Sequence, residues 1–400
     1  MTNSREQLYA AIDVGTTKVV TLVAKADMEG GMDVVAQGHA SSAGMRKGMV
    51  VNPDAMKECI RQSVREAEKT LGRKLPAVIA GVTGSHLHSH NESSSGEEDS
   101  VIPEDGYFTR STVDGLVQAS AHNPIGMRVI QTVPRSFEET HVIMGDSVPI
   151  DTLTATLSGA GVTLRGLVPE HLASGEAVLN PEERVLGVVL ADIGGGSTDI
   201  VVYREGSVWY TTSIPIAGQH FTTDVATGLG LLPIAAEHAK IVKGSTWFEH
   251  LTERDTADVK PALSSTAIPV HLKKLNRLLH DRAVELVRMM MYRLASNGMV
   301  HIPSAGIVLT GGSSALPGLT DIVADYGKCP VRIGSPSSTL GLPDELLNPT
   351  YSTAVGLVLW AIRQRHINTL PESRYIGSSP PRSGGWLSRF KSKQPTEVSV

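Results

Sequence analysis

The sequence predicts an α/β protein made of two or three compact units, and three observations lead to this. The chain has 400 residues, whereas a single hydrophobic core usually serves about 100–200 residues. Its 39 glycines and low aromatic content of 4% suit close-packed layers of helices and strands joined by tight turns. An apolar strand that ends in Asp and continues through a turn of Gly, Ser and Thr into a second strand occurs twice, near residues 11–18 and 190–199.

Composition excludes several classes of protein. Apolar residues make up 41% and charged residues 19% of the chain, which is typical of a soluble globular protein. The net charge of −5 argues against a nucleic-acid-binding protein, which usually carries a concentrated basic surface. The cysteines, Cys59 and Cys329, are too few for a disulfide scaffold, a cysteine zinc site or an iron–sulfur cluster, and they fit a reducing cytosol.

The elements follow from apolar runs for strands and from three- and four-residue apolar spacing for helices. Asn52 is a suitable N-cap and Pro53 a suitable first residue for a helix at 53–71. The stretch 84–105 is polar and acidic, which predicts a loop. The other predicted strands are 8–12, 19–23, 77–82, 127–133, a pair within 184–203, and 302–310. The other predicted helices are a short one that ends near 121 and helices at 222–228, 234–242, 281–296 and 352–363. Between 150 and 178 the pattern predicts a helix, a strand and a second helix.

The repeated hairpin has the chemistry of a phosphate-binding loop. Glycines let backbone N–H groups approach anionic oxygens, hydroxyl groups add donors, and carboxylates can hold a hydrated divalent cation. No Gly-x-x-x-x-Gly-Lys-Ser/Thr string occurs and strands follow the turns, so this is not a Walker A loop. A third Gly-rich turn, between a strand and a helix, is a suitable place for a nucleoside. The predicted binding residues are Gly15, Thr16, Thr17, Lys18, Gly194, Gly195, Gly196, Ser197, Thr198, Gly311, Gly312 and Ser313, and Asp13 and Asp192 are the candidate catalytic residues and Mg²⁺ ligands through water.

With these turns the chain resembles the actin, sugar-kinase and 70-kDa chaperone superfamily, and within it the FtsA family of bacterial cell-division proteins. The resemblance implies two lobes, each a ribonuclease-H-like domain, with a site for ATP and Mg²⁺ between them and a small subdomain inserted in the first lobe. It places Gly218, Glu237 and Lys240 against the adenosine, whereas the residues alone leave open a solvated helix face for Glu237 and Lys240. The matching strings span roughly residues 8–360 and include Gly48-Met49-Val50-Val51-Asn52, Gly84-Ser85-His86-Leu87-His88, Leu172-Ala173-Ser174, Asp192-Ile193-Gly194-Gly195-Gly196 and Gly306-Ile307-Val308-Leu309-Thr310-Gly311-Gly312.

The resemblance also implies a division of the chain. The core of the first lobe would comprise 1–83, completed by 150–180 and 350–367, with the insertion at 84–149. The second lobe would comprise 181–243 and 301–349 as its core and 244–300 as its small subdomain. A flexible linker at 368–384 and an amphipathic membrane-binding helix at 385–394 would follow.

The chain departs from the family pattern in the first lobe and beside the adenosine. The stretch 137–153 is short, so the second half of the inserted sheet is expected to be missing or degenerate. The double glycine expected near Gly218 is reduced to one. His86, His88 and His90 alternate and would share one face of a strand, but no acidic ligand has a fixed position, so we do not expect a metal site there.

The C-terminal tail has the pattern of an interfacial helix. At about 100° per residue, its apolar side chains fall on one arc, with cations at the edges or opposite. No acidic residue occurs between 375 and 396, so such a helix would meet anionic lipid, weakly in single copy and firmly through avidity in a polymer. The alternative is a disordered basic tail. The predicted membrane-binding residues are Trp386, Leu387, Arg389, Phe390, Lys391 and Lys393.

The resemblance implies an ATP-binding, actin-like cell-division protein that polymerises and tethers the tubulin-like FtsZ ring to the membrane. Its partners would be FtsZ, further copies of itself, anionic lipids and later division proteins. It would be a cytoplasmic protein, peripheral on the cytoplasmic face of the cell membrane at the septum, since residues 1–7 lack the features of a signal peptide and no apolar stretch reaches the length of a span. Any ATP hydrolysis is expected to be slow, because the residues show no positioned general base.

Other functions of the superfamily remain as alternatives. A sugar or acetate kinase would need a substrate pocket between the lobes and no amphipathic tail. Rod-shape and pilus-assembly relatives also stay open, although the tail favours division over pilus assembly, and residues 84–135 favour it over rod shape. A dehydratase activator would need bridging cysteines that the chain lacks, and no peptide-binding domain of a chaperone follows residue 370.

Overall fold

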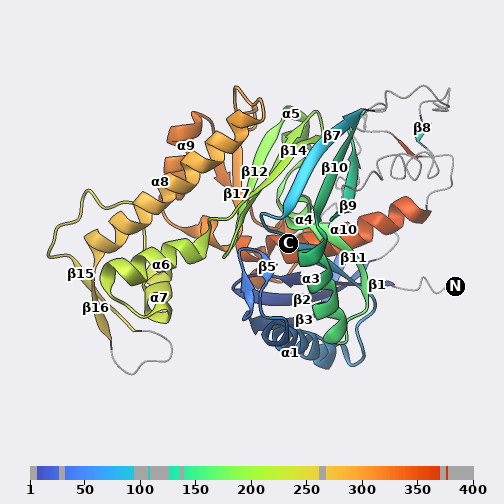
Figure 1. Cartoon of the computed structure of the whole chain (residues 1–400), viewed down its shortest axis with the longest axis horizontal. Coiled ribbons are helices and arrows are strands. Elements are labelled where there is room, and N and C mark those ends of the chain that lie inside the picture. The colour runs from blue at the N-terminus through green and yellow to red at the C-terminus, as the bar shows by residue number, and fades with distance from the viewer. Residues whose placement is uncertain are drawn as a thin grey trace, which may run out of the picture.

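Two five-stranded sheets form the two lobes of the molecule, with helices against their faces (Figure 1). The computed structural model describes residues 7–26, 32–93, 107–108, 126–135, 139–260, 267–369 and 375–376. In the first sheet an antiparallel meander of three strands is continued by two parallel strands. The order is β11-β6-β1-β2-β3, with β1 Gln7–Val14, β2 Lys18–Ala26, β3 Met32–Ser41, β6 Val78–Val82 and β11 Leu164–Pro169.

The second sheet repeats this plan strand for strand. Its first three strands again form an antiparallel meander, and two further strands pair in parallel beside the first. The predicted hairpins are the first two strands of each sheet, so the prediction of a two-lobed α/β fold with a duplicated plan is confirmed. The order is β14-β13-β12-β17-β18, with β12 Val188–Ile193, β13 Thr198–Arg204, β14 Ser207–Ile214, β17 Ile307–Thr310 and β18 Val331–Ile333.

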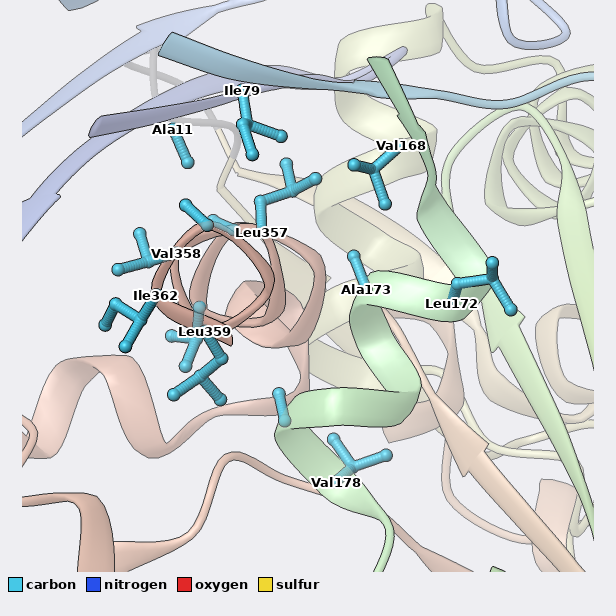
Figure 2. Packing of buried hydrophobic residues seen from close by; sticks show 14 of the residues in the cluster. Ala11, Ile79, Val168, Leu172, Ala173, Val178, Leu357, Val358, Leu359 and Ile362 are labelled. Atoms are coloured by element: carbon cyan, nitrogen blue, oxygen red, sulfur yellow. The ribbon is translucent and has the colours of Figure 1, made fainter. Parts of the chain in front are cut away.

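Two helices, α4 (Glu170–Val178) and α10 (Ser352–Thr369), join the lobes through a shared apolar core. Figure 2 shows α10 beside α4, with Leu357 of α10 pointing toward Ile79 of β6 and with Leu359 and Ile362 on the other side of the helix. The helices cross closely because residue 356 is glycine, and a Cβ there would overlap the carbonyl of Ala173. The core draws on both sheets, with Leu22 from the first and Leu190 from the second. The lobes are therefore joined by packing behind the two hairpins.

Helix α1 (Pro53–Leu71) shows how closely local signals set the boundaries of an element. The Asn52 side chain accepts a hydrogen bond of 3.2 Å from the backbone of Ala55, which satisfies one of the free N–H groups of the first turn. Gly72 ends the helix in the left-handed conformation with φ 73°. The predicted helix at 53–71 is confirmed.

The remaining elements flank the two sheets. The other helices are α3 Ser147–Gly159, α5 Pro181–Leu186, α6 Gly218–Leu229, α7 Pro233–Lys243, α8 Leu272–Ser296 and α9 Leu319–Gly327, with 3₁₀ turns at Gly312–Ala315, Ser338–Leu340, Asp344–Leu347 and Pro349–Tyr351. Short strand pairs are β4 Met45–Arg46 with β5 Met49–Val50, β15 Thr256–Val259 with β16 Ile268–His271, and β8 Tyr107–Phe108 with β19 Tyr375–Ile376.

The stretch predicted to be an insertion contains a sheet of three strands in the order β7-β10-β9. Its strands are β7 (Leu87–Ser93), β9 (Met127–Pro134) and β10 (Glu139–Asp146), and the expected short helix ending near 121 lies outside the described residues. The polar loop predicted at 84–105 is wrong for residues 87–93, and a strand occupies part of the stretch expected to lack one. The β7 strand is polar because Ser89 and Asn91 donate to carbonyl oxygens of β14 across the lobes.

Other boundaries differ from the predictions for physical reasons. The helix predicted at 281–296 begins earlier, at Leu272. Its first part is rich in charged residues, so the sequence pattern did not reveal the buried face formed by Leu275 and Leu279. The strand predicted at 302–310 is limited to β17. No prediction covered β3 and β14, the third strand of each meander. Both lie at the edge of a five-stranded sheet, where half-buried positions weaken the apolar signal.

The end of the chain lies mostly outside the described residues. Helix α10 runs on to Thr369, and residues 375–376 form a strand within the predicted linker. The predicted amphipathic helix at 385–394 falls outside the described part of the chain. Within the described ranges no single helix is long and apolar enough to span a membrane, and α6 with α7 meets that test only as a pair bent by 108°.

Candidate nucleotide-binding site

The two repeated hairpins face the same cavity, which has a volume of about 500 Å³ and lies between the lobes. Gly15 at the β1–β2 turn and Gly195 at the β12–β13 turn both line it. Every predicted binding or catalytic residue of the described chain lies on its wall except Thr198. Those on the wall are Asp13, Gly15, Thr16, Thr17, Lys18, Asp192, Gly194, Gly195, Gly196, Ser197, Gly218, Glu237, Lys240, Gly311, Gly312 and Ser313.

The hairpins share one turn geometry. In the first, the N–H of Gly15 donates to the carbonyl of Lys18 at 3.0 Å, and in the second the N–H of Gly194 donates to the carbonyl of Ser197 at 3.0 Å. Glycine is required where the hairpins meet, because a Cβ on Gly196 would overlap the Thr16 hydroxyl. Without a Cβ at this turn, a phosphate could approach the backbone N–H groups closely.

Thr198 is the one misplaced residue. Its side chain is fully buried and donates to the carbonyl of Ile216 at 2.7 Å, so it holds the start of β13 and does not reach the cavity. Side chains alternate along a strand, and Thr198 points away from the face that carries the aspartates beside it.

Buried carboxylates and a lysine form the floor of the cavity. Burial is the main cause that raises the pKa of Asp13 to about 6; the nearby charge of Asp192 raises it further, and Lys18 opposes the shift. Burial also raises the pKa of Asp192, against hydrogen bonds from Ser174 and Thr353, the latter 2.9 Å long. Burial lowers the pKa of Lys18. Because like charges are held close together out of water, this floor favours a bound cation.

Two acidic residues of the wall were not predicted. Asp199 accepts hydrogen bonds of 2.5 Å from Thr83 and 3.0 Å from Ser197, and burial raises its pKa to about 6. Glu170 has a buried Oε1 without a hydrogen-bond partner, and burial followed by the charges of three aspartates raises its pKa well above the usual value. Asp199 closes the second hairpin and Glu170 opens a helix at the end of parallel strand β11, so its position after a strand is the signal that could have found it.

The opposite wall carries the residues expected beside a nucleoside. The ammonium of Lys240 donates to Glu237 at 2.7 Å, to Thr222 at 2.9 Å and to the carbonyl of Gly218 at 3.1 Å. A solvated helix face is therefore wrong for Lys240, which is largely buried, while Glu237 is partly exposed. The single glycine at 218 is close to the third turn, where Ser313 donates to the carbonyl of Gly194 at 2.8 Å.

The alternating histidines do not form a site. His86 is buried ahead of β7, while His88 and His90 are exposed. His90 contacts Glu92 at 2.8 Å and His88 contacts Asp146 at 3.7 Å, so the pair on the strand have separate partners. Within the described ranges no group of three His, Cys, Asp or Glu side chains is arranged to hold a metal.

Comparison with known proteins shows the family of this chain. A family model described as "Cell division protein FtsA" matches residues 189–356. Cell division protein FtsA of Neisseria meningitidis is 30% identical over 97% of this chain and 98% of its own length. The chain belongs to the FtsA family. The same protein of Pseudomonas aeruginosa is 30% identical over 90% of both chains, and that of Escherichia coli is 27% identical over 95% of this chain and 97% of its own length.

Solved structures share the fold of this FtsA-family chain. A type IV pilus biogenesis complex of PilM and PilN has a chain with a TM-score of 0.65, 17% identity, and coverage of 90% of this chain and 99% of its own. MreB5 of Spiroplasma citri bound to AMPPNP has a TM-score of 0.54, 14% identity, and coverage of 91% and 99%. At this identity they show the fold alone, whereas family membership gives the chain an actin-like role in cell division, ahead of the kinase, rod-shape and pilus-assembly alternatives.

Proposed function

We propose that the chain binds ATP with Mg²⁺ between its lobes. The single observation that carries this is the convergence of two glycine turns of identical geometry on one cavity. The close glycine contacts and the lysine at the floor fit a phosphate chain. The unpartnered oxygen of Glu170 fits a hydrated cation. Asp13 and Asp192 would hold the cation through water, and the cation would neutralise phosphate charge. Gly218, Glu237 and Lys240 would hold the nucleoside.

We also propose Glu170 as the general base of a slow ATP hydrolysis. Its raised pKa and its unpartnered oxygen on the cavity wall suit a group that accepts a proton from water. We expect Glu170→Gln to lower the hydrolysis rate about 100-fold while ATP affinity stays within about threefold, because a positioned base contributes to the reaction and not to binding. Phosphate release and calorimetric titration measure the two quantities. Wild-type hydrolysis by this variant would contradict the assignment.

The cellular role we propose is polymerisation on the cytoplasmic face of the membrane at the septum, where the chain tethers FtsZ and meets later division proteins. Support comes from family membership and from the amphipathic pattern of residues 386–393. ATP would act mainly by favouring the closed, polymerising form over the open form. Polymerisation would then convert weak single anchors into firm attachment.

Co-sedimentation of the full chain with anionic vesicles and FtsZ tests this role. We expect FtsZ to pellet with vesicles only when this chain is present, and more strongly with ATP than without nucleotide. Vesicles of neutral lipid are the control, since the tail cations would have no anionic surface to meet. FtsZ that stays in solution while this chain pellets would refute the tether.

A further inference from the structure

A second hollow, of about 680 Å³, lies on the second lobe between α8, α9 and the segment 246–250. None of the residues on its wall lines the nucleotide cavity. Its size is in the range of about 300–1,000 Å³ that is common for binding pockets. We refer to it as the α8–α9 groove.

The groove presents an exposed tryptophan and a half-buried phenylalanine that are both held in place. Trp247 is 51% exposed. Its ring nitrogen donates to Asp321 at 3.0 Å, and its carbonyl accepts from Asn276 on α8 at 2.8 Å. The Phe248 ring lies edge-on against His280, with centroids 5.1 Å apart. An aromatic surface fixed before binding loses little entropy on association and is typical of interaction hot spots.

The charged side chains on the groove wall are acidic, and Arg288 donates from outside the wall to the Tyr326 hydroxyl at 3.0 Å. The wall carries the carboxylates of Glu249, Asp321 and Asp325, all on exposed residues, and neither Lys nor Arg. Asp325 contacts Lys328 at 2.6 Å, but both side chains are more than 70% exposed. Because water screens such an exposed ion pair, Lys328 neutralises the charge of Asp325 only weakly. The groove therefore fits a segment that brings both aromatic side chains and cations.

We propose that the α8–α9 groove binds the C-terminal segment 386–393 of a neighbouring copy of this chain. The segment supplies Trp386, Leu387 and Phe390 together with three cations, and no acidic residue occurs between 375 and 396. A second copy is indicated because the end of α10 and the α8–α9 region lie towards opposite ends of the molecule (Figure 1). The 16 residues from 370 to 385 would span only about 22 Å on average as a flexible chain.

This contact would compete with lipid for the same side chains. A segment seated in the groove has its apolar arc and its cations covered, so it cannot enter a headgroup layer at the same time. In the absence of lipid the groove would keep the anchor out of water, and an anionic membrane would draw it away. The inference goes beyond the proposed function and requires no nucleotide.

A labelled synthetic peptide of residues 385–394 tests the groove directly, with the full chain and without lipid or nucleotide. Fluorescence anisotropy should show binding with a micromolar Kd, and Trp247→Ala should weaken it at least about tenfold, as removal of a central aromatic anchor does. Tyr292→Ala is the matched control, since Tyr292 is a 69% exposed aromatic residue of α8 outside the groove. Equal binding by the two variants, or no binding by the wild-type chain, would overturn the proposal.

A charge exchange separates the contact from any effect on folding. The double change Glu249→Lys and Asp325→Lys, which keeps the hydrogen bond from Trp247 to Asp321, should abolish binding of the natural peptide. A peptide with Glu at positions 389, 391 and 393 should bind this variant and not the wild-type chain. If it binds neither, the groove is not the site. Failure here would leave the proposed function standing, because nucleotide and vesicle binding are absent from the assay.

Discussion

We expect Asp192→Ala to abolish the binding of Mg-ATP to the full chain. The carboxylate is buried at the floor of the cavity, where it accepts hydrogen bonds from Ser174 and Thr353 beside the charge of Lys18. Its loss leaves Asp13 as the remaining one of the two aspartates that balance the charge of Lys18, and it removes one of the two proposed ligands of the cation. We expect the affinity for Mg-ATP to fall at least about 1,000-fold, which corresponds to about 4 kcal/mol. Isothermal titration calorimetry measures it.

Two variants show whether the effect belongs to the site. Asp258→Ala removes an exposed carboxylate of β15 and should leave affinity unchanged. Asp192→Asn keeps the shape of the side chain while relieving the burial of like charges, so the nucleotide-free protein should melt no lower than wild type. Retained Mg-ATP affinity in Asp192→Ala would reject the assignment of the cavity.

Deleting residues 386–400 should release the chain from anionic vesicles. The segment offers three apolar side chains, each worth roughly 1–2 kcal/mol on partial burial, and three cations at about 1 kcal/mol each near an anionic surface. In a polymer these small terms act together, so their loss should reduce the bound fraction at least about tenfold. Co-sedimentation with vesicles containing phosphatidylserine measures the bound fraction.

Nucleotide binding provides the internal control for this deletion. The cavity lies among residues 13–353, so the shortened chain should bind Mg-ATP with the affinity of the full chain. Replacing Arg389, Lys391 and Lys393 by Gln tests the cations alone, and should make the remaining binding independent of salt. If the shortened chain pellets with vesicles as the full chain does, the anchor lies elsewhere.

The sequence was most informative where a local pattern has a single structural meaning. A strand ending in Asp before a glycine turn predicted both hairpins, and Asn52 with Pro53 predicted the start of α1. The sequence was least informative where a polar stretch can be either a loop or a strand that contacts another part of the protein. The polar stretch around Ser89 was predicted as a loop, yet it is a strand whose polar side chains meet the second lobe.

Two errors at the site come from strand pairing and register. Glu170 belongs to neither hairpin motif, and the pairing of β11 beside β6 brings it to the cavity. Thr198 belongs to the hairpin motif, but strand alternation turns its hydroxyl toward Ile216. Residue type and spacing indicate the chemistry that a side chain can perform. Whether the side chain points into the cavity depends on the register of its strand.

By itself the sequence determined the duplicated turns, the capped start of α1 and the chemistry of the candidate ligands, because backbone preferences and apolar periodicity act over a few neighbouring residues. The tertiary structure alone decided that four carboxylates and a lysine share one buried floor, and that Trp247 stands exposed among acids. Burial and electrostatic interaction are sums over groups that are distant in sequence, so they come into existence only when the lobes pack together.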